Sequence, residues 1–132
     1  MVLRRVLLRA IYDAWRKAKP IIRREVRKCN TKVPRLEVAR VILSDDGELV
    51  GICDAEKNAI IISAGALEEV SRMFKLSEKS LKCLIFGLIM HEARHYVDIV
   101  CNGLRYDVHR ELMEKRAKDY AAEWLEKCLE NP

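Results

Sequence analysis

The pentapeptide His91-Glu92-Ala93-Arg94-His95, an H-E-x-x-H motif, lies within a mainly apolar stretch that follows helical spacing. Leu84 and Leu88 fall on the side of the two histidines, and a second apolar row falls on the opposite side, formed by Ile89, Ala93 and Val97. A helix that is apolar on both sides must be covered on both sides. The sequence therefore predicts a central, buried helix, against which the rest of the chain packs.

The same motif carries a chemical signal. Two histidines four residues apart on a helix project from one face about one turn apart, so both can bind a single Zn²⁺. Glu92, between them, can reach a metal-bound water and take its proton. The alternative is a pair of core histidines held by hydrogen bonds, but two buried imidazoles beside a carboxylate are costly without a ligand.

Local signals place the remaining elements. Ser77 marks the start of the motif helix, Asn102-Gly103 marks its end, and Asp107 can N-cap a last helix that runs to about Leu129. Before the motif we expect a short helix over residues 66–74. The N-terminus reads as an amphipathic helix of about five turns, followed by a second helix that begins at Pro20 and ends near Asn30.

Between these helical regions the chain is rich in valine and isoleucine and is interrupted by turn residues. The expected strands are residues 36–43, 49–53 and 59–63. Short turns between them predict a three-stranded antiparallel meander. The fold class is therefore α+β, in a single domain over residues 1–132, with a basic helical segment at 1–35 and a core at 36–130.

A catalytic zinc needs a third protein ligand and an open position. The metzincin pattern requires Gly and His where this chain has Asp98 and Cys101, so that class is excluded. The remaining candidates for the third ligand follow the motif in sequence and are Asp107, His109, Glu111 and Glu114. Small residues, Ala117 and Ala121, follow Glu114 and would let the last helix approach the motif helix closely.

The motif, a helix end and then Glu114-Lys115-Arg116-Ala117 on a second helix together resemble the gluzincin zinc metallopeptidases. The small size is similar to the minigluzincins, soluble minimal relatives of the catalytic domains of HtpX-type and CAAX-prenyl membrane proteases. The likeness covers about residues 36–130. It implies a zincin-like fold, with His91, His95 and Glu114 as zinc ligands and Glu92 as general base and acid.

The resemblance also implies supporting residues. The family often has an aspartate four residues after the ligand glutamate, where this chain has Lys118. Either the support of a ligand histidine is weaker in this chain, or its orienting role shifts to Asp98 or Asp119. Tyr106 and His109 are candidates for stabilising an oxyanion, although ordinary semi-buried or surface roles would also explain them.

In gluzincins the last strand is an edge strand above the zinc, and an extended substrate adds to it through main-chain hydrogen bonds. Carried over to this chain, that strand is residues 58–63. The expected substrate-binding residues are Asn58, Ala59, Ile60 and Ile61. The alternative is an ordinary core strand.

Charge is unevenly distributed along the chain. Residues 1–35 hold twelve Lys or Arg and two Asp or Glu, a balance of +10, whereas residues 36–132 have a balance of −5. A basic arm on an acidic body can pack against that body, or it can contact a polyanion such as nucleic acid. We expect packing through the apolar side of the helix, with nucleic-acid contact as the alternative.

The five cysteines include no C-x-x-C pair, which argues against a cysteine-built zinc site, and their odd number argues against a complete disulfide framework. Most are expected to be buried small residues. The absence of Gln and the scarcity of Thr suggest a thermophilic source. The longest apolar run, Cys83 to Met90, is too short to span a membrane, and no signal peptide is visible, so a cytoplasmic protein is expected.

Two classes of function follow. The first is a soluble zinc-dependent peptidase that acts on a peptide or unfolded-protein substrate, either active or held latent by a terminal segment in the cleft. The second is a non-catalytic, regulatory zinc-binding module whose basic arm contacts nucleic acid.

Overall fold

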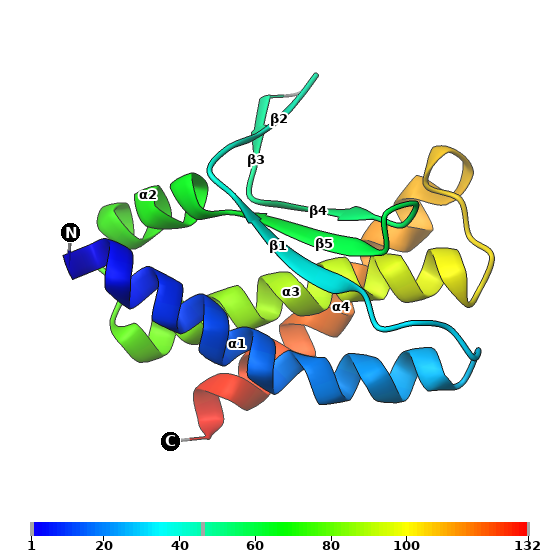
Figure 1. The fold of residues 1–132 in the computed structure, drawn as a ribbon, viewed down its shortest axis with the longest axis horizontal. Coiled ribbons are helices and arrows are strands. Elements are labelled where there is room, and N and C mark those ends of the chain that lie inside the picture. The colour runs from blue at the N-terminus through cyan, green and yellow to red at the C-terminus, as the bar shows by residue number, and fades with distance from the viewer. Residues whose placement is uncertain (1, 46, 132) are drawn as a thin grey trace.

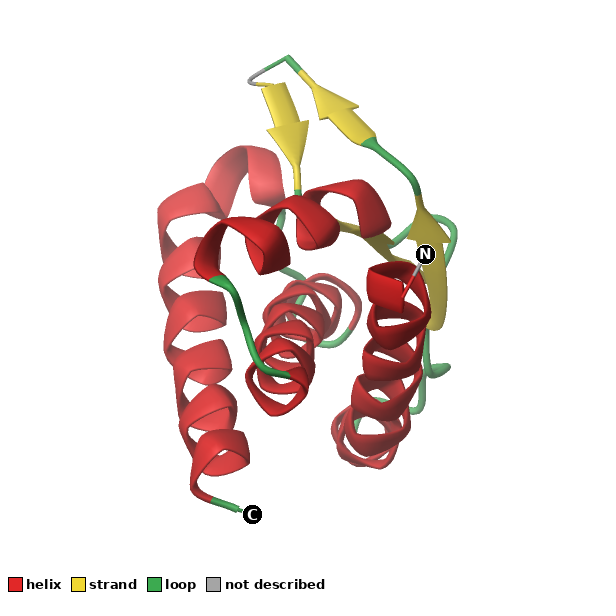
Figure 2. Ribbon diagram, turned by 90° about the vertical axis from the view of Figure 1, so that its left-hand side faces the viewer, coloured by secondary structure: helices red, strands yellow, loops and turns green. Residues whose placement is uncertain are grey.

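The motif helix, α3 (Glu78–Val100), lies between two other long helices, α1 (Val2–Arg27) and α4 (Tyr106–Glu130), as Figure 2 shows. This computed structural model describes residues 2–45 and 47–131. Buried side chains occur on all sides of α3, because α1 and α4 pack on its flanks and the sheet covers a third side. The predicted central helix is confirmed.

The ends of α3 agree with their sequence signals. Ser77 is the N-cap, and its Oγ accepts a hydrogen bond from the backbone N–H of Ser80 at 3.0 Å. Just beyond the C-terminal end of α3, Gly103 has a φ of 66°, a left-handed conformation that glycine adopts without strain. These two local devices set the length of the motif helix.

The expected cap of the last helix is wrong. The helix α4 begins at Tyr106, with Arg105 at the N-cap position and no side-chain cap of the usual kind. Asp107 lies in the first turn, where its carboxylate pairs with the Arg105 side chain at 2.9 Å. The backbone N–H at the start of α4 is satisfied by His109 and not by Asp107: Nδ1 of His109 accepts a hydrogen bond from the backbone N–H of Arg105 at 3.0 Å.

The two expected N-terminal helices are one continuous helix, α1, with Pro20 inside it. The apolar stripe runs through this position without interruption, because Ala18 and Ile22 on either side of Pro20 are both buried. Pro20 itself is exposed, so water can reach the Arg16 carbonyl that loses its helical partner. Packing of the stripe on α3 therefore keeps α1 continuous past the proline.

The main sheet has three strands, β1 (Arg35–Ala39), β4 (Gly51–Asp54) and β5 (Ala59–Ser63), in the order β1-β5-β4. The strands β4 and β5 are antiparallel, but β1 and β5 are parallel. The predicted α+β class is confirmed, whereas the predicted antiparallel meander is wrong. The central strand is β5, although β4 lies between β1 and β5 in sequence.

The physical reason lies in the composition of β5. Ala59, Ile60 and Ile62 are fully buried. A strand that is apolar without alternation is typical of a central position in a covered sheet. The expected strand over residues 36–43 breaks after Ala39, and its second half forms a hairpin, β2 (Ile42–Ser44) with β3 (Gly47–Leu49), which projects away from the body (Figure 1).

The short helix α2 (Ala64–Phe74) follows β5 directly and packs across the same end of the molecule as the start of α1 (Figure 1). Leu7, Ala10, Ala14 and Ile22 of α1 belong to the same buried cluster as the inward residues of α3 and β5. The expectation that the basic arm packs on the body through its apolar stripe is therefore confirmed.

Four of the five cysteines form disulfides, which corrects the expectation of buried free thiols. One bond joins Cys29, after α1, to Cys101, at the end of α3, and the other joins Cys83 of α3 to Cys128 of α4. Cys53 on β4 is free. The partners lie 72 and 45 residues apart in sequence, so the pairing depends on the packing of the three long helices.

Among the described residues, no helix combines the length and the hydrophobicity that crossing a membrane requires. The cytoplasmic location and the thermophilic source stay predictions.

Candidate metal centre

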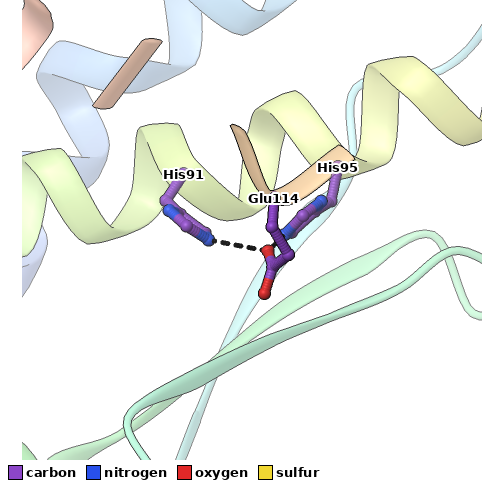
Figure 3. Close-up of side chains that lie close together, drawn as sticks. All are labelled: His91, His95 and Glu114. Atoms are coloured by element: carbon purple, nitrogen blue, oxygen red, sulfur yellow. Dashed lines mark ion pairs between the residues drawn. The ribbon is translucent and has the colours of Figure 1, made fainter. Parts of the chain in front are cut away.

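His91 and His95 of α3 and Glu114 of α4 converge at one point (Figure 3). Each residue offers a ligand atom, and the three atoms lie within 4.8 Å of one another. Oε1 of Glu114 is 2.7 Å from Nε2 of His95 and 3.4 Å from Nε2 of His91. The helical spacing of the motif explains the pair of imidazoles, and the close packing of α4 on α3 brings the carboxylate to them.

These residues fit a divalent metal ion. Oε1 of Glu114 is buried and accepts no hydrogen bond from the described residues, so a buried anionic oxygen faces two imidazole nitrogens. A cation among the three would satisfy that oxygen. Two imidazoles and one carboxylate form the donor set of catalytic zinc sites that keep a fourth position open. The group could hold a metal ion.

The local electrostatics also suit a metal ligand set. Burial and the neighbouring His95 lower the pKa of His91, which favours the neutral imidazole that binds metal. Burial alone would raise the pKa of Glu114, but His95, Tyr106 and His91 together lower it below the ordinary value. At neutral pH the site therefore presents an ionised carboxylate and, at His91, an uncharged ring.

Glu92 lies on the same helix but is not part of the ligand group. Its side chain is buried, with 6% exposure, and desolvation followed by the charge of Glu114 raises its pKa to about 8. The backbone of β4 comes close to it, since a Cβ added at Gly51 would meet Oε2 of Glu92 at 3.5 Å. A nearby divalent cation would favour the ionised form of this carboxyl group.

We expect this buried carboxyl group to make the stability of the metal-free protein fall with pH. Between the ordinary pKa of 4.5 and the folded value of about 8, the unfolded chain has lost this proton and the folded chain retains it. The free energy of unfolding therefore decreases as pH rises through that window. Glu92→Gln should remove this pH dependence and stabilise the metal-free protein near pH 8 by an amount on the order of a few kcal/mol.

Urea unfolding of metal-free wild type and Glu92→Gln, measured between pH 5 and pH 8, checks this expectation. A stability difference that stays constant over that range would contradict the raised pKa of Glu92.

A cavity of about 440 Å³ opens directly on the three converging residues. Besides His91, His95, Glu114 and Glu92, its walls are formed by β4 together with Leu49, Ile99 and Tyr106. Because β4 is the last strand of its sheet, its outer edge pairs with no strand among the described residues. The outer edge of β4 is thus available beside the candidate metal centre.

A second cavity, of about 540 Å³, adjoins the first at Gly51, His91 and Glu92. Its walls come from α2, α3, α4 and the start of β4, and they are mostly aliphatic, including Leu67, Leu84, Leu88, Ala121 and Leu125. Lys118, which stands where the resemblance expects an aspartate, also lines it, and its charge contributes to the lowered pKa of His91. The candidate metal centre therefore has a polar side and an apolar side.

The expected substrate strand is misplaced. The prediction assigned substrate pairing to Asn58, Ala59, Ile60 and Ile61 at an edge strand, but β5 is the central strand, with β1 and β4 on its two sides. Its backbone groups are already paired. Asn58 has a structural contact instead, because its Oδ1 lies 2.9 Å from the hydroxyl of Tyr96.

The other predicted residues divide into two groups. Tyr106 is at the centre, where its hydroxyl donates a hydrogen bond to Oε2 of Glu114 at 3.1 Å and its ring meets that of His95 edge-on. Three residues point elsewhere: His109 caps α4, Asp107 pairs with Arg105, and Asp119 pairs with Lys115 on the solvent side. Glu111 is exposed and does not belong to the ligand group.

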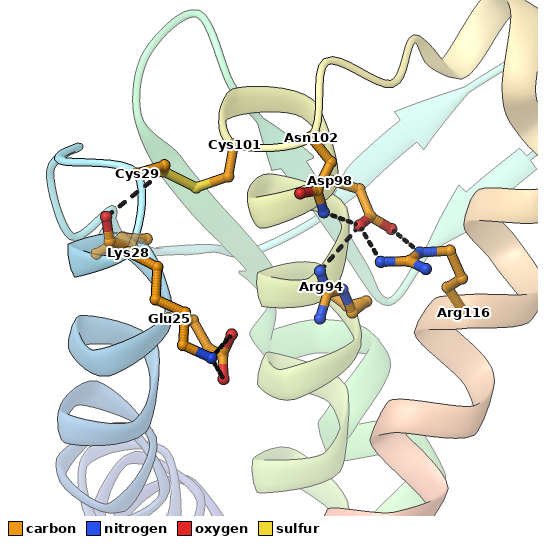
Figure 4. A network of polar contacts seen from close by, with 9 residues as sticks. Glu25, Lys28, Cys29, Arg94, Asp98, Cys101, Asn102 and Arg116 are labelled. Atoms are coloured by element: carbon orange, nitrogen blue, oxygen red, sulfur yellow. Dashed lines mark hydrogen bonds and ion pairs between the residues drawn. A yellow bond between two sulfur atoms is a disulfide. The ribbon is translucent and has the colours of Figure 1, made fainter.

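Asp98 does not touch a ligand histidine but joins the two helices that carry the ligands (Figure 4). It is completely buried, and Arg116 of α4 donates to both of its oxygens, at 3.0 and 2.9 Å. Arg94 and Asn102 each donate a further hydrogen bond at 2.9 Å. Asp98 lies three residues after His95, and Arg116 lies two residues after Glu114. The contact between Asp98 and Arg116 therefore holds α4 beside the motif helix close to the proposed ligands.

The expected orientation of a ligand histidine by Asp98 is therefore wrong. Burial alone would raise the pKa of Asp98, but the hydrogen bonds from Arg116 and Asn102, with the charge of Arg94, lower it. Nδ1 of His95 is buried and has no hydrogen-bond partner among the described residues.

Two residues of the cavity were not foreseen. Gly51 lets β4 approach Glu92, and a glycine inside a strand pattern is the signal that could have indicated such a close approach. Cys53 lines the same cavity, but burial, with the charges of Glu92 and Asp54, raises its pKa to about 12. Its thiol is therefore protonated at neutral pH in the metal-free protein.

Comparisons with models of known families, with curated proteins and with solved structures find no match to this chain.

Proposed function

We propose that this chain is a zinc-dependent peptidase that cleaves an extended, flexible peptide segment. The observation that carries the proposal is the convergence of His91, His95 and Glu114 at a cavity where the buried carboxyl group of Glu92 also lies. A structural metal site would need neither an adjacent free carboxyl group nor an open cavity. The combination favours hydrolysis over a purely structural role.

In this proposal His91, His95 and Glu114 hold Zn²⁺. When bound, the ion would polarise the scissile carbonyl group and increase the acidity of a water molecule. Glu92 accepts the proton of the attacking water and then delivers it to the leaving amine. Tyr106 keeps the Glu114 carboxylate in place through its hydrogen bond.

The surroundings of the centre suggest how substrate is held. The outer edge of β4 offers main-chain groups with which an extended peptide can pair. The aliphatic cavity beside His91 and Glu92 is large enough for a bulky apolar side chain next to the scissile bond. Neither cavity is lined by α1 or by the last turn of α4, so these terminal segments do not fill the cleft in the described part of the chain.

The proposal is tested first by metal content. We expect about one Zn²⁺ per chain, lost in His91→Ala, His95→Ala and Glu114→Ala because each removes one of three protein ligands. Glu111→Ala is the matched control, since this glutamate lies three residues before Glu114 on the exposed side of α4. Zinc retained in Glu114→Ala, or lost in Glu111→Ala, would exclude the proposed third ligand.

The same proteins then test hydrolysis. A library of unstructured peptides should be cut by the zinc-loaded wild type, chiefly beside large apolar residues, and not after chelation or by His95→Ala. Cleavage that survives chelation would assign the activity to another source. A zinc-loaded protein that cuts no peptide would favour the second class of function, a non-catalytic zinc-binding module.

A further inference from the structure

The outward side of α1 is a second feature with a chemical signature, remote from the candidate metal centre. We define the basic face of α1 by its exposed residues at steps of three or four, which are Arg5, Arg9, Tyr12, Arg16, Lys19, Arg23 and Arg27. At 1.5 Å per residue this row extends over about 33 Å. Except for Tyr12, every member carries a positive charge.

Most of the positive charge of this face is left without a paired acidic group in the described part of the chain. None of its cations forms an ion pair among the described residues. Two acidic residues of α1 are half-buried: Asp13 lies one turn from Arg9 and from Arg16 and interacts electrostatically with Arg16, and Glu25 pairs with Lys28. Like charges at neighbouring helical positions destabilise a helix, so an external polyanion would relieve this repulsion.

The apolar side of α1 is already packed against the body of the protein, and this limits which polyanion the basic face of α1 can bind. Leu7, Ala14, Ile22 and Val26 are buried against the body of the protein. An interfacial membrane helix needs such a side free to enter the lipid. Attachment to a bilayer would therefore rest mainly on charge, with Leu8 and Tyr12 as the exposed large hydrophobic residues described on α1.

Tyr12 adds an exposed aromatic ring to the basic face of α1, and phosphate binding alone would not require such a ring. Its ring is 60% exposed at the middle of the row, and the guanidinium group of Arg16 lies 4.7 Å from the ring centroid. Exposed aromatic rings flanked by cations are the elements on which bases of single-stranded nucleic acids stack. The regular line of cations fits the regular spacing of phosphates along one strand.

We propose that the basic face of α1 binds single-stranded nucleic acid, through phosphate contacts along the row and base stacking on Tyr12. The interaction is independent of the metal centre and largely independent of base sequence. RNA and DNA share the required chemistry, and the experiment includes both.

The probes are fluorescently labelled 25-nucleotide strands of RNA and of DNA, the corresponding duplex, and vesicles of phosphatidylserine mixed with phosphatidylcholine. Binding to the zinc-loaded 132-residue protein is measured by anisotropy or sedimentation between 50 and 200 mM salt. For single strands, contacts to six phosphates predict a slope of log affinity against log salt of about −4. Affinity should thus fall by on the order of a hundredfold over this range.

The test variant combines Arg9→Gln, Arg16→Gln and Arg23→Gln, and should reduce the magnitude of the salt slope by about 2. The control combines Lys57→Gln, Arg72→Gln and Lys127→Gln, three exposed cations elsewhere that change net charge equally. The control should keep the wild-type slope. Tyr12→Ala should leave the slope unchanged and weaken single-strand binding by about tenfold.

Several results would overturn the proposal. These are the absence of strand binding at 50 mM salt, equal loss in the test and control triples, or an unchanged affinity of Tyr12→Ala. Tighter binding to the vesicles would assign the face to lipid, and tighter binding to the duplex would exclude the stacking contact. Because each readout is binding, none of these results depends on peptidase activity.

Discussion

Replacing Glu92 by glutamine is expected to abolish peptide hydrolysis while leaving the fold and the zinc content intact. Glutamine has nearly the same shape but cannot accept the proton of the attacking water, and general base catalysis typically contributes about 10²- to 10⁴-fold. Glu92 is outside the group His91, His95 and Glu114, so zinc should remain at about one ion per chain. The measurement is kcat/KM on a peptide cut by the wild type, together with zinc analysis of both proteins.

Glu111→Gln provides the matched control for this prediction, because it makes the same chemical change at an exposed position of α4. It should retain wild-type kcat/KM. If Glu92→Gln still hydrolyses peptides at the wild-type rate, another group must act as the base. If it loses zinc as well as activity, Glu92 contributes to holding the metal ion.

The second large effect is expected at Asp98. Asp98→Ala should lower the free energy of unfolding by on the order of 3 kcal/mol, because it leaves the mostly buried guanidinium of Arg94 without its partner. It also removes both hydrogen bonds from Arg116, which hold α4 beside the motif helix. Zinc affinity should therefore fall as well, by about 10- to 100-fold as for other residues that support metal ligands.

Urea unfolding and competition with a zinc chelator measure the two effects separately. Asp119→Ala is the control, since Asp119 is 69% exposed and pairs with Lys115 on the solvent side, where such a pair contributes about 0–1 kcal/mol. The contribution of Asp98 should persist at neutral pH and disappear only in acid, because its pKa is lowered. Equal effects of the two substitutions would exclude a special role for Asp98.

The elements that sequence reasoning located correctly are those specified by neighbouring residues. Helical periodicity, the Ser77 cap and the glycine at position 103 define α3, and they act within a few residues of one another. The motif placed both imidazoles on one face for the same reason. Glu114 was reached through a resemblance to known peptidases, and its position beside the histidines depends on the packing of α4 on α3.

The order of strands was not accessible in the same way. Short turns suggested that neighbours in sequence pair in space, whereas β1 pairs with β5 across the hairpin and β4. The unbroken apolar run Ile60-Ile61-Ile62 was a signal for a central strand that the edge-strand expectation set aside. The disulfides were missed because an odd number of cysteines does not show which of them meet when three helices pack.

The two disulfides overlap along the chain, since Cys83 lies within the segment closed by Cys29 and Cys101, and Cys128 lies beyond it. A single backbone cut anywhere between residues 29 and 128 would leave both pieces covalently attached. A nick in the exposed β2–β3 hairpin, for instance, would still leave α1 bonded to the end of the motif helix. After a cut before Cys29, no disulfide would join the N-terminal piece to the rest of the chain. After a cut there, the packing of its apolar stripe would be what retains the basic helix, while every proposed zinc ligand stays in one cross-linked piece.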